Sequence, residues 1–279
     1  MQKSIQQIKR VYFTVLALNW LAVGLVLPIF VLFMGSRGIN LLQLGIIMGA
    51  YSATIVLLEL PTGGLADAVG RKKVALLART IDILASGVIF FSFSFAGFLL
   101  GMILMGVARA LNSGALDAWY VDSLQTADSD IDLQPALAQA GTVTLLALGI
   151  GTLAGGALPT LFSGLPGGES ALISPLSTTL LASLAMQFLL LAIIAKAVHE
   201  PPRAQAGQAD LRAGFRSVPA IVGDAVSLTR QNRSLPLLMG ATLIGGFALA
   251  GVETFWQPHF AALLGGSAEQ SWLFGLVMA

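Results

Sequence analysis

Residues 63–73 read GGLADAVGRKK, a short basic segment between two long apolar runs. Gly63, together with Pro61 just before the segment, permits a helix to end in a tight turn. Asp67 is placed to accept hydrogen bonds from free backbone donors at a helix start, and Gly70 suits a position with positive φ. The three basic residues that close the segment favour anionic lipid headgroups. The pattern predicts a loop between two spans at a membrane surface.

The composition is that of a membrane protein: of the 279 residues, 56% are hydrophobic and 10% are charged, and the mean hydropathy is +0.84. Soluble domains are less apolar than this, so the excess must face lipid. The net charge of +1 gives no indication of nucleic-acid binding. The chain has no cysteine, and its two histidines, His199 and His259, lack metal-ligand spacing. With no nucleophile–base pair in the polar segments, we expect no metal, no cofactor and no enzyme activity.

Apolar runs long enough to cross a bilayer recur along the chain. A spanning helix needs about 20 apolar residues, and helices are expected because an isolated strand would leave its backbone groups unpaired in lipid. The run from Val11 to Met34 is too long for a signal peptide and has no cleavage site after it, so it is interpreted as the first span. An eighth span begins near Ser271, after seven predicted spans at 11–34, 40–62, 74–92, 97–121, 136–162, 175–198 and 235–263.

Basic residues set the expected orientation. They cluster at 3–10, at 71–73 and at 199–234, whereas the opposite side holds Arg37 and almost nothing else. By the positive-inside rule, the N-terminus, the 63–73 loop and the 199–234 segment face the cytoplasm. An acidic loop at 128–132 departs from the trend, but acidic residues contribute little to the rule.

The polar segment 199–234 divides the chain. Apolar residues at helical spacing between Leu211 and Ala225 predict an amphipathic helix on the inner membrane surface, and a solvated linker is the alternative. Close contacts between helices are predicted at two glycine pairs, Gly45-x-x-x-Gly49 and Gly151-x-x-x-Gly155. The predicted domains are a six-helix half at 1–198, a cytoplasmic linker at 199–234 and the start of a second half at 235–279.

Polar side chains inside the spans are the first candidates for function. Arg109 lies near mid-membrane, where a charge is costly, so it is expected to face the bundle interior with a partner. Asn112 and Ser113 share its helical face. Arg79 and Asp82 are three residues apart on one face and are predicted to form a structural ion pair.

Three acidic residues each keep two interpretations. Glu59, about one turn inside the end of the second span, either titrates near neutrality as a buried carboxylate or reaches water. Asp117 either lines a pathway or lies at the interface. Glu253 is deep in the seventh span, where its neighbour Trp256 favours a substrate-facing patch and a structural role is the alternative.

The spacing Gly63-x-x-x-Asp67-x-x-Gly70-Arg71-Lys72 resembles the loop between the second and third helices of major facilitator superfamily transporters. The resemblance implies an all-α integral membrane bundle, in which this loop takes part in the conformational switch between two six-helix halves. It also implies that Arg71 pairs with Asp122 as a structural latch. Ala68 stands where the family usually has a basic residue.

Further motifs extend this resemblance. The run Glu59-Leu60-Pro61-Thr62-Gly63 resembles bacterial drug-efflux members. Arg109 resembles the fourth-helix arginine of proton-coupled members, which implies proton relay or substrate contact, with an interhelical ion pair as the alternative. The segments Leu27-Pro28-Ile29-Phe30 and Gln257-Pro258-His259-Phe260 are consistent with the parallel repeats of the superfamily. Secondary active transport is implied, most readily proton-coupled multidrug-type efflux by alternating access in a bacterial inner membrane, with protons moving through Glu59 and Arg109.

The length of the chain leaves alternatives open. The family fold has twelve helices, and the chain ends within the predicted eighth, so we expect it to be truncated. It is then either the front part of a transporter or a protein that does not transport by itself. The second alternative is a truncated fragment or a membrane subunit that works with a second chain. An uptake carrier for a nutrient or an organic ion fits the same loop motif. The expected partners are the lipid bilayer, a small-molecule substrate and protons as the coupling ion, without nucleic acid.

Overall fold

The structure is a computed structural model that describes residues 4–63, 65, 69–168, 170–200, 223, 227, 229, 234–264 and 270–279. Within these residues the fold is all-α, and seven helical segments are long and apolar enough to cross a membrane. The helices are α1 (Ile5–Val26), α2 (Phe30–Ser36), α3 (Leu41–Gly63), α5 (Arg71–Phe91), α6 (Phe95–Asn112), α7 (Ala115–Ala127), α8 (Leu133–Leu161), α9 (Ser177–Ala197), α11 (Ser234–Leu264) and α12 (Trp272–Met278).

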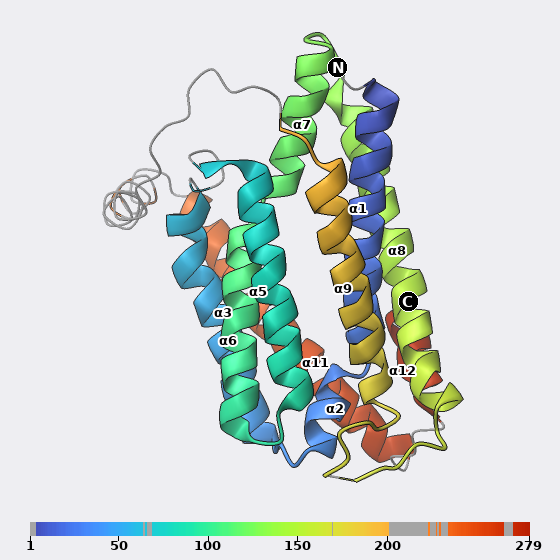
Figure 1. Cartoon of the computed structure of the whole chain (residues 1–279). Helices are drawn as coiled ribbons and strands as arrows, with labels where there is room; N and C mark the ends of the chain where they lie inside the picture. Colours follow the sequence, from blue (N-terminus) through green and yellow to red (C-terminus); the bar gives the residue numbers. More distant parts are fainter. Residues whose placement is uncertain are drawn as a thin grey trace.

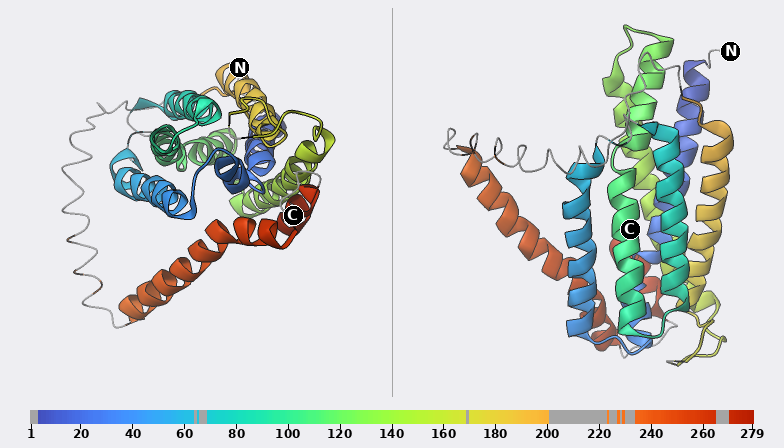
Figure 2. Two further views of the ribbon diagram at one scale, coloured as in Figure 1. Left: turned by 90° about the horizontal axis from the view of Figure 1, so that it is seen from below. Right: turned by 60° about the vertical axis from the view of Figure 1, so that its left-hand side comes forward.

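The helices from α1 to α9 form one upright bundle (Figure 1). α1 packs mainly against α8 and α9, α5 lies between α6 and α9, and α3 packs on α6. α11 leaves the bundle obliquely, touching it near α2, and α12 returns to pack on α8 (Figure 2). We call the end of the bundle that carries residue 4 and the start of α5 the N-terminal end, and the other the α2 end. The predicted amphipathic helix between Leu211 and Ala225 lies outside the described residues.

Glycines explain how closely α1 approaches α8. A Cβ atom at Gly151 would lie 2.8 Å from the carbonyl oxygen of Leu21, and one at Gly24 would lie 2.7 Å from that of Leu148. The predicted contact at Gly151 and Gly155 is therefore present, with α1 as the partner. The prediction for Gly45-x-x-x-Gly49 is wrong for the described residues, because a Cβ at either glycine meets nothing within 4 Å.

Two predicted spans are interrupted. The first was expected to be continuous over 11–34, but α1 begins at Ile5 behind the capping residue Ser4 and ends at Val26, before α2 starts. Pro28 explains this break, because it lacks a backbone N–H and its ring clashes with the carbonyl four residues earlier. The fourth span, expected over 97–121, is broken between α6 and α7, where Gly114 has a φ of +73°.

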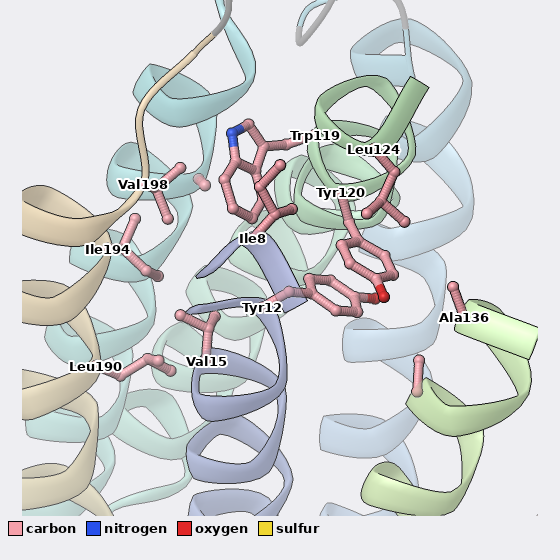
Figure 3. Close-up of a cluster of buried hydrophobic side chains, with 12 residues drawn as sticks. Ile8, Tyr12, Val15, Trp119, Tyr120, Leu124, Ala136, Leu190, Ile194 and Val198 are labelled. Carbon is pink, nitrogen blue, oxygen red and sulfur yellow. The ribbon is translucent and has the colours of Figure 1, made fainter. Parts of the chain in front are cut away.

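Apolar clusters fill both ends of the bundle. At the N-terminal end, the rings of Tyr12 and Tyr120 stack with centroids 3.9 Å apart, next to buried Trp119 (Figure 3). At the α2 end, a second cluster gathers around the fully buried rings of Phe33 and Phe98. The spans between the two clusters carry the polar residues described below.

Arg37 ties the α2 end together. Its side chain is only 5% exposed and donates hydrogen bonds to the carbonyl oxygens of Phe90, Ser92 and Leu172. The guanidinium also lies 4.1 Å from the ring centroid of Phe93. Burial lowers the pKa of Arg37 from its ordinary value. The lone basic residue predicted on this side therefore joins two separate loops to α2.

Candidate functional site

A cavity of about 400 Å³ lies in the middle of the bundle, between the two apolar clusters. α1, α3, α5, α6 and α9 all contribute to its wall. Most of the wall is apolar, with Trp20, Phe30 and three methionines among its residues. Its polar residues are Asn19, Tyr51, Arg79, Asp82, Ser86, Arg109, Asn112, Ser183 and Gln187. A chamber of this kind suits a small amphipathic molecule.

The predicted pair of Arg79 and Asp82 forms part of this wall. The Nη1 atom of Arg79 donates to Oδ2 of Asp82 at 2.8 Å, and its Nη2 donates to Oδ1 of Asn19 at 2.6 Å. The side chain of Arg79 is 6% exposed and that of Asp82 is 24% exposed. Asp82 thus keeps contact with the cavity while its partner is held from two sides.

Arg109 reaches the same cavity from α6. Its side chain is exposed there, and Asp82 lies within the electrostatic reach of both arginines. Asn112 lies one helical turn further along the same wall. Two arginines against one aspartate leave one excess positive charge on the described wall. The structure therefore brings Arg79, Asp82, Arg109 and Asn112 together, although the sequence placed the first two apart from the pathway.

A chain of polar contacts between α5 and α9, in the wall of the same cavity, was missed in the sequence. Nε2 of Gln187 donates to Oγ of Ser86 at 3.0 Å, and Oγ of Ser183 donates to the carbonyl oxygen of Ala22 at 2.8 Å. The spacing held a signal, since Ser183 and Gln187 are four residues apart and therefore share one face of α9. Arg79, Asp82 and Ser86 share a face of α5 in the same way.

The basic segment at 63–73 holds three helices together at the N-terminal end. Nη1 of Arg71 lies 2.6 Å from Oδ2 of Asp122. The φ of Gly70 is +121°, as its position in the motif predicts. Nζ of Lys72 donates to the carbonyl oxygen of Ala195 at 2.6 Å, so a cation meets the C-terminal end of α9.

The sequence missed one partner of this loop. Glu200, which follows α9, accepts a hydrogen bond from the backbone N–H of Lys72 in the first turn of α5. A carboxylate is favourable there because it offsets the positive end of the helix dipole. Gly63 ends α3, and Asp67 lies outside the described residues, so its predicted contacts stay predictions.

Glu59 and Asp117 are bonded away from the cavity wall. Oε1 of Glu59 accepts from Oγ of Ser113 at 2.8 Å, at the break between α6 and α7. Oδ1 of Asp117 accepts from the hydroxyl of Tyr12 at 2.7 Å. Neither residue lines the central cavity. The structure thus places Arg109 in the cavity, but not Glu59 or Asp117, the two acidic residues that were proposed alongside it.

Glu253 and Trp256 lie on α11. Glu253 is exposed, and the ring of Trp256 packs 5.7 Å from that of Phe274 on α12. Neither lines the central cavity, although a second, largely apolar cavity of about 540 Å³ lies near them between α2, α11 and α12. Trp256 therefore makes a packing contact between α11 and α12, and the expected substrate-facing role of Glu253 stays a prediction.

Comparison with known families agrees with this architecture. The sequence model of the Major Facilitator Superfamily matches residues 12–279, so the chain belongs to that family. Among curated proteins, nothing matches the chain. Membership makes it an integral membrane protein and a secondary transporter of small molecules rather than an enzyme.

Proposed function

We propose that the chain exports a small molecule in exchange for protons by alternating access, and that the central cavity holds both the cargo and the coupling group. The observation that supports this most strongly is Asp82, a carboxylate at mid-span that faces the cavity between Arg79 and Arg109. Ionisable groups inside a membrane bundle mark substrate and proton pathways. We place the N-terminal end in the cytoplasm, following the distribution of basic residues.

The charges of the cavity give a simple coupling scheme. With Asp82 ionised, the described wall carries one excess positive charge and Arg79 is held by its partner. A proton on Asp82 cancels the carboxylate charge and releases Arg79 from its ion pair. The two arginines then repel each other across the cavity. Protonation therefore disfavours the relative position that α5 and α6 have in this structure. Proton binding and the position of these helices are therefore linked.

The direction of transport is a further part of the proposal. The run at 59–63 resembles efflux members, and the mostly apolar wall suits the amphipathic molecules that such proteins export. An uptake carrier would use the same cavity in the opposite direction. The sign of the pH change inside sealed vesicles distinguishes the two.

The test uses Asp82→Asn in vesicles loaded with a pH-sensitive dye and challenged with a panel of amphipathic compounds. We expect proton-linked flux to fall at least tenfold, because the amide keeps the shape of the side chain and cannot carry a proton. Exchange of labelled compound across the membrane without a pH gradient should persist. Asp130→Asn in the exposed loop before α8 is the matched control. Undiminished proton-linked flux in Asp82→Asn would exclude this residue as the coupling group.

A further inference from the structure

The break between α1 and α2 is bridged by a side chain from another helix. In a continuous α-helix, the N–H of Val31 would bond to the carbonyl of Leu27, four residues earlier. Here the N–H of Val31 donates to Oε1 of Gln257 at 3.2 Å, and Nε2 of Gln257 donates to the carbonyl oxygen of Leu27 at 2.8 Å. One carboxamide therefore stands in for the missing helical hydrogen bond, because it supplies both the acceptor and the donor.

Gln257 is unusual for its helix. All 31 residues of α11 are described, and Gln257, at 3% exposure, is the buried one among them. The helix otherwise presents large apolar side chains outward, as at Leu243 and Phe247. A buried amide on such a helix needs hydrogen-bond partners, and the described partners are the two backbone groups that the break leaves free. The contact is therefore specific to the break rather than to general packing.

The two proline motifs meet at this point. Gln257 precedes Pro258 as Leu27 precedes Pro28, and a phenylalanine follows two residues after each proline. Equivalent positions of the two motifs are in direct contact, as expected where two repeats face each other across an axis. Pro258 also lines the apolar cavity beside Val31. The two motifs thus form a junction at the α2 end.

We propose that Gln257 is the positioning residue that sets the angle between α1 and α2 and holds the α2 end closed. While Gln257 is docked, Leu27 and Val31 are kept apart and the span stays bent. When α11 moves away, the two backbone groups bond to each other and the span straightens. Each state satisfies the same donor and acceptor, so the junction is a two-state element that movement of α11 biases.

The first measurement is a distance between spin labels on the membrane-embedded protein. The chain has no cysteine, so Leu41→Cys and Leu263→Cys, both at exposed positions on either side of the junction, are labelled without background. We expect Gln257→Leu to move most of the distance distribution to longer values, because leucine can neither donate nor accept. His259→Leu, at an exposed position two residues further along α11, is the matched control. Equal distributions for the two variants would overturn the proposal.

The variant Gln257→Glu separates the hydrogen-bonding role of Gln257 from a role in packing alone. In Gln257→Glu, a protonated carboxyl can donate to Leu27 and accept from Val31, whereas a carboxylate can only accept. Acid should therefore restore the short distance in Gln257→Glu, beyond any change in the parent protein over the same pH range. Because one sample is measured at two pH values, poor insertion of Gln257→Leu does not remove this test. No acid rescue would contradict the proposed pairing.

Pro28→Ala gives the second check, since it removes the cause of the break. It should lengthen the distance as Gln257→Leu does, and the double variant should add nothing, because both act on one contact. Additive shifts would show that Gln257 acts elsewhere. None of these readouts requires proton coupling or export, so they can fail or succeed independently of the proposed function.

Discussion

The first and fourth spans are both broken, but their free backbone groups are satisfied from different places. At the break between α6 and α7, the carbonyl oxygen of Ala110 accepts from Oγ1 of Thr62 at 3.2 Å, and the side-chain hydroxyl of Ser113 donates to Glu59. Both partners come from α3, inside the same bundle. At the break between α1 and α2, the partner is Gln257 of α11, outside the bundle.

The difference separates a fixed bend from a conditional one. A break whose partners belong to the same packed bundle keeps its hydrogen bonds when that bundle moves as a unit. A break whose partner belongs to another body keeps them only while the two bodies stay together. We therefore expect the break at Gly114 to be present in every state of the transport cycle, and the break at Pro28 in only some of them.

The largest effect is expected from Gly151→Leu, which disrupts the close packing of α1 on α8. The added side chain would meet the carbonyl oxygen of Leu21, at 2.8 Å from the Cβ position, and the Cα atom of Gly24, at 3.0 Å. Such overpacking costs about 3 kcal/mol, so the melting temperature in detergent should fall sharply. The spin-label distance between the α2 end and α11 should also lengthen, because α1 is displaced from Gln257.

Gly141→Leu is the matched control on the same helix. A Cβ at Gly141 meets nothing within 4 Å, so this variant should melt at or above the parent temperature. If both variants melt alike, then close packing of α1 on α8 does not hold the first break in place. The first break would then be maintained by the hydrogen bonds of Gln257 alone.

A smaller effect is expected from Thr62→Val, which removes the donor to Ala110 and keeps the shape of the side chain. The carbonyl of Ala110 is buried at the break and keeps its hydrogen bond from the backbone N–H of Ser113 at 3.4 Å. Losing its second donor, Thr62, should therefore cost about 0.5–1 kcal/mol in unfolding free energy. Thr80→Val is the control, because Thr80 is exposed and bonds within its own helix to Leu76. The spin-label distance at the α2 end should not change in either variant. A lengthened distance in Thr62→Val would mean that the two breaks are coupled, and that the break at Gly114 is not independent of α11.

The parts of this architecture that the sequence predicted are those that depend on continuous apolar runs. The second span was expected at 40–62 and is found as Leu41–Gly63, and the seventh was expected at 235–263 and is found as Ser234–Leu264. The contact between Arg71 and Asp122, implied by the family resemblance, is present in the structure. Local pattern was sufficient for the two spans because lipid imposes one length and one composition on every span, whereas the ion pair was expected from the family resemblance.

The features that were missed depend on partners far along the chain. Pro28 and Gly114 were visible in the sequence, but proline and glycine are tolerated in spanning helices wherever neighbours satisfy the freed groups. The partners that satisfy groups at these breaks are Gln257 and Thr62, which lie 226 residues from Val31 and 48 residues from Ala110, so local pattern could not show them. Asn19 was missed in the cavity for the same reason, since its partner Arg79 lies 60 residues away.

The smallest structural effect is expected from Glu59→Gln, at the break between α6 and α7. The amide oxygen can still accept from Ser113, so the unfolding free energy should change by less than about 0.5 kcal/mol. Transport decides what the carboxylate does beyond that bond. If Glu59 carries a coupling proton, proton-linked flux should fall while the melting temperature stays, because the amide cannot titrate. Unchanged flux would assign Glu59 to the break alone, where it holds Ser113 as Thr62 holds Ala110, and would leave coupling to the charged groups of the cavity.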